Sequence, residues 1–298
     1  MTEHRSLFDD HAPMLLGLAY RMTGSAADAE DIVQEARVRF WQRGDDVTMP
    51  RAWLAKTVTH LCLDHLKSAR VRRETYVGTW LPEPVSTSAG PFVGDAGAVS
   101  LAFLTLLEEV PPTERAAFVL VELCDHTPGE AAFVLDKTPE AVRQLVHRAR
   151  ARLKRGDARG VVDPHPALTH ADLFARLGDA LARSDHRALL ALLAPDVVVK
   201  SDGGGKVKAA LNVVESRDKV ARLLIGLWKK QPPNAVLSLV PGNGGVALVG
   251  VEDGRVTSVQ QIVIESGEIT ALLVVTNPDK LVIFERDVTP GRPISSPS

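Results

Sequence analysis

The feature that most constrains the fold of this 298-residue chain is a stretch that cannot form a core. Residues 74–100 read ETYVGTWLPEPVSTSAGPFVGDAGAVS, in which proline, glycine and serine interrupt every apolar run. Such a composition favours turns and extended chain over long helices or strands. The residues before and after this stretch are therefore expected to fold separately. A second hinge of the same kind is expected at Gly156–Pro166.

The composition is that of a globular protein with two or three domains. Hydrophobic residues make up 45% of the chain and charged residues 24%, while the net charge is only −2, so charge has to be read segment by segment. No apolar run has the length of a membrane span and no signal peptide is visible, which predicts a cytoplasmic protein that does not contact membranes. Cys62 and Cys124 lack the spacing of metal ligands, so no metal or cofactor is expected.

Residues 26–41, AADAEDIVQEARVRFW, predict an amphipathic helix. Its apolar residues recur at helical spacing, whereas Asp28, Asp31 and Glu35 share a different face. Ser25 can cap the helix, and an acidic first turn suits the positive end of the helix dipole. The ordinary interpretation of such a helix is a solvated acidic surface over a buried apolar stripe.

A basic helix is expected to begin at Pro50, where a missing N–H costs little. Trp53 lies in its apolar stripe and is expected in the core rather than as a platform for a stacked base. Cationic side chains in such a run suit contact with the phosphates of a nucleic acid, and a merely solvated basic face is the alternative. The candidate donors are Lys56, His60, Lys67, Arg70, Arg72 and Arg73.

Residues 127–155 predict a helix-turn-helix. Thr127–Glu130 is a capping box with proline at the first helical position, and a turn at Asp136-Lys137 leads into a second, basic helix. Arg143 and Gln144 are suited to base edges, and the later arginines to phosphates. The candidate DNA-binding residues of the second helix are Thr138, Glu140, Arg143, Gln144, His147, Arg148, Arg150 and Arg152.

Residues 168–286 change from helical to strand-like patterns. Helical periodicity over 168–193 is followed by five strand-like runs, with a further helix at 216–230 between the first two. This order predicts an α+β domain in which a curved antiparallel sheet wraps over helices. The expected strands are Val197–Lys200, Ala235–Val240, Val246–Val251, Val256–Ile264 and Ile269–Thr276.

The run DAEDIVQEA resembles region 2 of bacterial extracytoplasmic-function sigma factors, and the helix-turn-helix resembles region 4 of the same family. The resemblance implies that Asp28, Asp31 and Glu35 bind core RNA polymerase. It also implies that the helix from Pro50 contacts the minus-ten promoter element and that the basic second helix reads the minus-thirty-five element. The family usually has glycine where Asp136 stands, although aspartate tolerates the left-handed conformation better than most residues.

The C-terminal part resembles the SnoaL-like cone fold, and three short motifs resemble those of the sigma-factor subgroup with such a domain fused behind region 4. The motifs are Trp80-Leu81-Pro82-Glu83-Pro84, Asp202-Gly203-Gly204-Gly205-Lys206 and Asn277-Pro278-Asp279-Lys280. The implied fold is multidomain: two all-α sigma domains, a region 2 helical bundle and a region 4 helix-turn-helix, plus a C-terminal α+β SnoaL-like domain. The implied boundaries are region 2 at 1–75, a linker at 76–100, region 4 at 101–156, a linker at 157–167, the SnoaL-like domain at 168–286 and a disordered tail at 287–298.

The sequence therefore predicts a non-enzymatic sigma factor whose partners are core RNA polymerase and promoter DNA, with no separate anti-sigma factor required. The stiff apolar peptide Trp80–Pro84 is expected to dock on the C-terminal domain near the other two motifs, which would modulate activity in cis. One alternative makes that domain a small-molecule sensor or an isomerase or cyclase type of enzyme. Asp202 and Asp279 are its candidate acids, but no histidine follows His186. A generic helix-turn-helix repressor would leave the acidic helix unexplained.

Overall fold

The computed structural model describes residues 2–43, 46–88, 91–92, 99–155 and 167–287, which form two compact units. The first unit comprises Met1–Thr75, Pro91–Gly97 and Leu104–Ala158, and the second comprises Tyr76–Gly90, Ala98–Phe103 and Arg159–Ser298. The second unit thus contains the first part of the expected 76–100 linker. Most of the linker expected at 157–167 and of the tail expected at 287–298 lies outside the described residues.

Three helices begin the first unit: α1 (Thr2–Thr23), α2 (Ala26–Arg43) and α3 (Pro50–Glu74). Their shared core holds large side chains that are fully buried, among them Leu18, Phe40 and Leu54. The break between α1 and α2 is capped as the sequence predicts, because the Ser25 hydroxyl accepts a hydrogen bond of 3.1 Å from the backbone N–H of Asp28. The buried stripe of α2 leaves Asp31 and Glu35 of its acidic face exposed to solvent.

The other helices of this part of the chain are α4 (Leu101–Leu107), α5 (Pro112–Phe118), the π-helical turn η3 (Val119–Leu123), α6 (Pro128–Leu135) and α7 (Pro139–Arg155). The capping box of α6 is formed: the Thr127 N–H donates to Glu130 Oε2 over 2.7 Å, and the Glu130 N–H donates to Thr127 Oγ1 over 3.2 Å. Asp136 then adopts the left-handed conformation, with φ 52° and ψ 48°, and turns the chain into α7. The predicted helix-turn-helix is confirmed.

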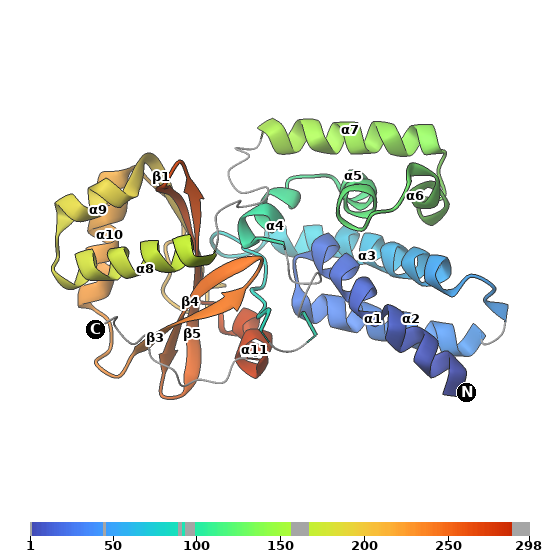
Figure 1. The fold of residues 1–298 in the computed structure, drawn as a ribbon, viewed down its shortest axis with the longest axis horizontal. Coiled ribbons are helices and arrows are strands. Elements are labelled where there is room, and N and C mark those ends of the chain that lie inside the picture. Colours follow the sequence, from blue (N-terminus) through green and yellow to red (C-terminus); the bar gives the residue numbers. More distant parts are fainter. Residues whose placement is uncertain (1, 44–45, 89–90, 93–98, 156–166, 288–298) are drawn as a thin grey trace. The chain divides into compact units, whose positions relative to one another are not determined.

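The second unit is an α+β domain built on one six-stranded sheet (Figure 1). Its helices are α8 (Ala167–Ala182), α9 (His186–Leu192), α10 (Arg217–Lys229) and α11 (Pro278–Asp287). Its strands are β1 (Leu193–Asp202), β2 (Val214–Glu215), β3 (Val236–Gly242), β4 (Gly245–Glu252), β5 (Arg255–Glu265) and β6 (Glu268–Val275), in the spatial order β2-β1-β6-β5-β4-β3.

The sheet is mixed, so the expectation of an antiparallel sheet is wrong in one place. β3 to β6 form an antiparallel meander, but β1 runs parallel to β6, with Val199 opposite Leu272. β1 is not part of the meander: it reaches the sheet directly from α9, and α10 intervenes before β3. Because no hairpin joins β1 to β6, the two strands are not forced to be antiparallel, and β1 runs parallel to β6.

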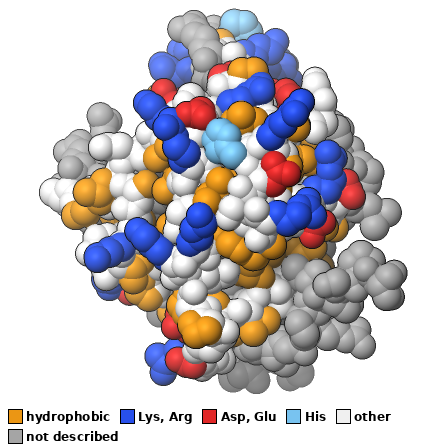
Figure 2. Space-filling view, turned by 90° about the vertical axis from the view of Figure 1, so that its left-hand side faces the viewer, with side chains coloured by type: hydrophobic (Ala, Val, Ile, Leu, Met, Phe, Trp, Pro, Cys, Tyr) orange, Lys and Arg blue, Asp and Glu red, His pale blue; other side chains and the backbone are white. Residues whose placement is uncertain are grey.

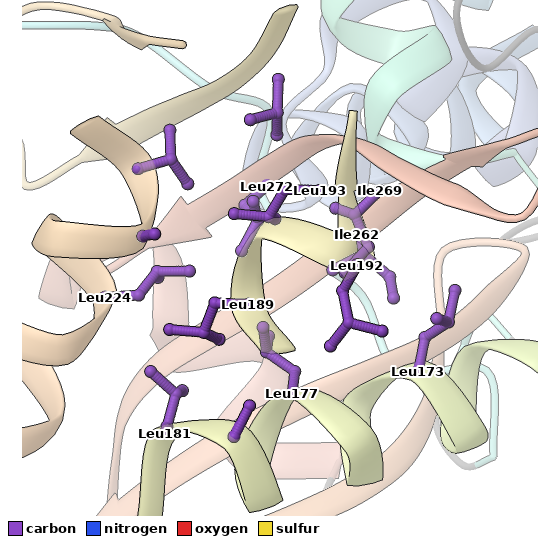
Figure 3. Close-up of a cluster of buried hydrophobic side chains, with 14 of the residues drawn as sticks. Leu173, Leu177, Leu181, Leu189, Leu192, Leu193, Leu224, Ile262, Ile269 and Leu272 are labelled. Carbon is purple, nitrogen blue, oxygen red and sulfur yellow. The ribbon is translucent and has the colours of Figure 1, made fainter. Parts of the chain in front are cut away.

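The two faces of the sheet carry separate hydrophobic cores. On one face, α8, α9 and α10 pack leucines such as Leu177, Leu189 and Leu224 toward Ile262 and Leu272 (Figure 3). The other face, reached by the alternate side chains of the strands, packs against Phe284 of α11 and against Leu81 and Leu101. Part of the expected linker is thus an integral layer of this domain.

Candidate promoter-binding surfaces and the docked linker

The acidic face of α2 is only partly open. Asp31 and Glu35 are exposed, and Glu35 pairs with Arg39 over 2.5 Å on the same helix. Asp28, in contrast, is half-buried beside α3, where its carboxylate lies 3.2 Å from His65 Nε2. The open part of this face is therefore Asp31 with Glu35.

Two of the candidate cations of α3 meet the turn of the helix-turn-helix. Lys56 pairs with the Asp136 carboxylate, and its Nζ also lies 5.0 Å from the centre of the Phe133 ring. His60 Nε2 lies 3.0 Å from the Val134 carbonyl oxygen and 3.4 Å from Asp136 Oδ2. The hydrogen bond from Lys56 lowers the pKa of Asp136, so that this carboxyl group is held in its charged form.

The remaining residues of α3 lie differently. Lys67 is exposed and pairs with Asp64 over 2.7 Å. Trp53 is half-buried: its ring packs against Phe40 with ring centres 6.0 Å apart, and it also lines an open hollow with Arg39 and Thr57, so the expected core position is only partly met. The side chains of Arg70, Arg72 and Arg73 lie outside the described ones.

The start of α7 presents the candidate base-reading residues. Thr138 caps the helix through a 3.2 Å hydrogen bond from the Ala141 N–H, and Glu140 pairs with Arg143 over 3.2 Å. Arg143, Gln144 and His147 are exposed and, with Arg148, line one open hollow. These side chains share one solvent-facing surface of the second helix, as docking into a major groove requires.

The later arginines of α7 are paired with carboxylates that the sequence analysis missed. Arg148 Nε and Arg152 Nε lie 3.1 and 2.9 Å from the two oxygens of Glu114, which is buried in α5. Arg150 lies 2.7 Å from Glu122 of η3. In the sequence, the spacing of Arg148 and Arg152, one helical turn apart, was the only local sign that both could bind the same carboxylate.

The motif residue Asp202 collects the hydrogen bonds that dock the linker. The Leu81 N–H donates to Asp202 Oδ2 over 2.8 Å, and Lys280 Nζ donates to the same oxygen over 2.7 Å and to the Leu81 carbonyl. Trp80 lies against this group, with its ring centre 4.1 Å from Lys280 Nζ. Pro82 and Pro84 are buried, and Glu83 between them is half-buried.

Tyr76, which the sequence analysis missed, completes this cluster. Its hydroxyl donates to Asp202 Oδ1 over 2.5 Å and accepts a 2.9 Å hydrogen bond from Asn277 Nδ2. Burial, with the hydrogen bond to Asp202, raises the pKa of Tyr76 well above its usual value. Gly204 has φ +59°, and a Cβ there would lie 2.3 Å from Asn277 Nδ2, so the motif needs glycine at this position.

The other motif residues line the rim of the cluster. Gly203 is buried, and a Cβ on it would lie 2.7 Å from the Val207 carbonyl oxygen, while Gly205 has φ +71°. Lys206 pairs with Asp279 over 2.6 Å at the surface, and Pro278 is the first residue of α11. The described contacts therefore bring residues of all three motifs together in one cluster.

A second attachment holds the linker beyond Pro84. The Val85 N–H donates to Asn243 Oδ1 over 2.8 Å, the Asn243 N–H donates to the Val85 carbonyl over 3.3 Å, and Ser86 forms a β-bridge with Gly242. Asn243 is buried in the β3–β4 turn with φ +44°. Nothing local in the sequence marks it as a partner of residues so far away.

The face of the second unit that carries α9 and α10 has mixed charge among its described residues. Figure 2 shows Lys and Arg side chains interleaved with acidic and hydrophobic ones on the face that carries α9 and α10. Within it, Asp218 pairs with Arg222 and lies 3.3 Å from His186 Nε2. Among the described residues no group of histidine, cysteine and acidic side chains is arranged to hold a metal ion. None of the described helices is long and apolar enough to cross a membrane.

Comparison with known proteins assigns the helical parts to a family. The family model of sigma-70 region 2 matches residues 7–72, and that of sigma-70 region 4 matches residues 100–153. The chain is 40% identical over 281 residues to the ECF RNA polymerase sigma factor SigJ of Mycobacterium tuberculosis, which covers 89% of each protein. The chain therefore belongs to the extracytoplasmic-function (ECF) RNA polymerase sigma factors. Such a factor joins core RNA polymerase and directs it to promoters.

Two further similarities extend beyond the helical regions. The probable ECF sigma factor SigI of M. tuberculosis is 32% identical over 279 residues, covering 91% of this chain and 92% of that protein. The crystal structure of M. tuberculosis SigJ matches with a TM-score of 0.74 at 36% identity, covering 93% of this chain and 97% of that one. The similarity to SigJ thus extends over both helical sigma regions and the C-terminal α+β domain, which together make up nearly the whole chain.

Proposed function

We propose that the C-terminal domain of this sigma factor regulates transcription in cis by holding the linker segment Tyr76–Ser86. The observation that carries the proposal is the buried pair Asp202–Lys280, which binds both the N–H and the carbonyl of Leu81. This segment lies between the two sigma regions in the sequence, so its docking shortens the chain available to separate them. Regions 2 and 4 have to reach two promoter elements at once, which makes linker length a means of control.

Regulation rather than catalysis is the role that the site supports. Asp202 is fully buried and already accepts hydrogen bonds from Tyr76, Leu81, Gly204 and Lys280. A general base must reach a substrate proton, and this carboxylate has no open side from which to do so. Asp279, the other candidate acid, pairs with Lys206 at the surface.

A small-molecule sensor has less support. The core between the sheet and α8, α9 and α10 is filled by leucine, isoleucine and valine side chains. The cavity lined by Ser100, His170 and Asn243 has a volume of about 20 Å³, which is room for one water molecule. Ligand pockets for metabolites are of the order of 300 Å³ or more.

For promoter recognition we assign the outer side of α7 to the minus-thirty-five element and the cationic side of α3 to the minus-ten element. Arg143, Gln144 and His147 are positioned to read bases, while Lys56 and His60 serve the minus-ten strand. Asp31 and Glu35, with Asp28 at the edge, form the surface for core polymerase. Since the regulatory domain is part of the chain, this scheme requires no separate anti-sigma factor.

The test of cis regulation is in vitro transcription with the full chain and core polymerase. Trp80→Ala, or truncation after Asn277, should change the transcription level without changing the preferred promoter sequence, and should increase protease cleavage between residues 86 and 98. A conservative control is Trp228→Phe in α10, which leaves the linker contacts in place. If Trp80→Ala and the truncation after Asn277 both left transcription and cleavage unchanged, the C-terminal domain would not regulate transcription.

A further inference from the structure

Asp136 occupies a conformation that glycine adopts without strain. It is one of the non-glycine residues with positive φ, and its side chain is exposed at the turn between α6 and α7. An aspartate there is tolerated because it is short and polar, but nothing in the turn itself requires a carboxylate. The partners of that carboxylate lie outside the helix-turn-helix.

Those partners are a lysine and a histidine of region 2. Asp136 pairs with Lys56 and lies 3.4 Å from His60 Nε2, both on α3, and His60 also meets the Val134 carbonyl at the end of α6. Lys56 and His60 are two of the donors that we assign to the minus-ten strand. A carboxylate held between two such donors takes the place that a DNA phosphate would occupy.

The same junction has a second polar contact. Arg115 of α5 is buried and donates over 2.8 Å to the Met22 carbonyl at the end of α1, and over 2.8 Å to Glu108. Burial lowers the pKa of Arg115 to about 10. A buried guanidinium bound to a carbonyl of another region stabilises the packed state, yet it can be solvated when the regions separate.

We propose that Asp136 is an intramolecular latch: its carboxylate, by holding Lys56 and His60, keeps region 4 packed on region 2 and covers the minus-ten donors until DNA replaces it. This inference rests on the function proposed for α3. The latch is distinct from the docked linker, because none of its residues belongs to the second unit. It explains why this turn carries aspartate at a position that suits glycine.

The test uses the full chain with Asp136→Asn and Asp136→Gly. Both variants remove the charge and both tolerate the left-handed turn, so the fold is preserved. Asp125 supplies matched controls, Asp125→Asn and Asp125→Gly, because it is also an exposed aspartate with positive φ, 54°, in the same unit. The probe is a fluorescein-labelled 20-nucleotide single-stranded DNA, and its binding is followed by anisotropy at low salt.

The Asp136 variants should bind this DNA at least fivefold more tightly than the wild type, and the Asp125 variants less than twofold more tightly. Equal affinities of the two sets of variants would overturn the latch, because the gain would then come from net charge alone. Adding Lys56→Ala to Asp136→Asn should remove the gain.

The packing of region 4 on region 2 is measured separately by small-angle X-ray scattering of the full chain. Asp136→Lys should increase the radius of gyration, and the swap Lys56→Asp/Asp136→Lys should return it to the wild-type value. An unchanged radius in Asp136→Lys overturns the latch. If the radius responds as expected but Lys56→Ala leaves DNA affinity unaffected, the latch stands as a closing contact, and it is the minus-ten role of α3 that fails.

Discussion

Lys280 Nζ lies 2.7 Å from Asp202 Oδ2, with the two side chains 8% and 0% exposed, and the main chain of Leu81 joins them through both of its polar groups. The hydrogen bonds to Leu81 do not depend on which side chain stands at position 81. The Leu81 side chain contributes separately, because it is buried in the core between the sheet and α11. Docking of the linker thus combines an ion pair, a backbone contact and an apolar contact in one place.

Removing one member of this pair should destabilise the second unit strongly. Lys280→Met leaves the Asp202 carboxylate buried without its cation, for which a loss of about 3–5 kcal/mol in the free energy of unfolding is expected. Lys206→Met is the matched control: its pair with Asp279 is 54% and 62% exposed, and such surface pairs contribute at most about 1 kcal/mol. Urea unfolding followed by circular dichroism measures both. The double variant Asp202→Asn/Lys280→Met should recover part of the loss, and equal effects of Lys280→Met and Lys206→Met would contradict this account.

Tyr76→Phe should weaken the same cluster and change its response to alkaline pH. The variant removes the phenolic donor to Asp202 Oδ1 and leaves that oxygen with the Gly204 N–H, at a cost of about 1–3 kcal/mol. Because the folded state raises the pKa of Tyr76 above its ordinary 10.0, its contribution is fully present below pH 10 and is lost as pH rises above that value. Stability measured between about pH 9 and pH 11 should therefore fall more steeply in the wild type than in Tyr76→Phe. Parallel curves would show that Tyr76 is not held in this way.

Substitutions on α7 should distinguish a residue that reads bases from a residue that binds phosphates. Arg143→Ala should cost roughly 1–3 kcal/mol and relax the preference at one position of the minus-thirty-five element. Arg150→Ala should weaken binding to all promoters alike and reduce the salt dependence by about one phosphate contact. Transcription from a library of minus-thirty-five sequences, with titrations in salt, measures both effects. An unchanged preference in Arg143→Ala would remove this residue from the reading surface.

Reversing charge on the open face of α2 should abolish holoenzyme formation. Asp31→Lys/Glu35→Lys alters exposed side chains, and it removes the pair of Glu35 with Arg39 on the same helix, which is worth about 0.5 kcal/mol or less. The fold should therefore survive while co-purification with core polymerase is lost. Asp172→Lys in α8, also an exposed acid, should co-purify normally. Wild-type recovery of core enzyme with the double variant would disprove the assignment of this face.

Local signals predicted the elements that chemistry within a few residues determines. The capping box at Thr127–Glu130 and the turn at Asp136 depend on neighbours along the chain, and the structure forms both. The stripe of buried residues on α2 could also be predicted, because helical spacing places its apolar residues on one side. The helix-turn-helix and the order of most helices and strands followed from such signals, whereas β2 and α11 were not expected.

Pairings across long distances were not readable in this way. A strand-like run shows which residues alternate but not which strand lies beside it or in which direction, so the parallel contact of β1 with β6 was missed. Tyr76 and Asn243 were missed for the same reason, since their partners lie far away along the chain. The carboxylate partners of the α7 arginines belong to this class as well.

The place of β6 in the sheet has a consequence for how the protein is made. β6 lies between β1 and β5, so the strand that is synthesised last among the six described ones stands inside the sheet and not at its edge. Lys280, which binds the linker, follows it directly. A growing chain therefore exposes both sigma regions before the site that will hold their linker can exist. For that interval of its synthesis, the linker cannot yet dock on the C-terminal domain.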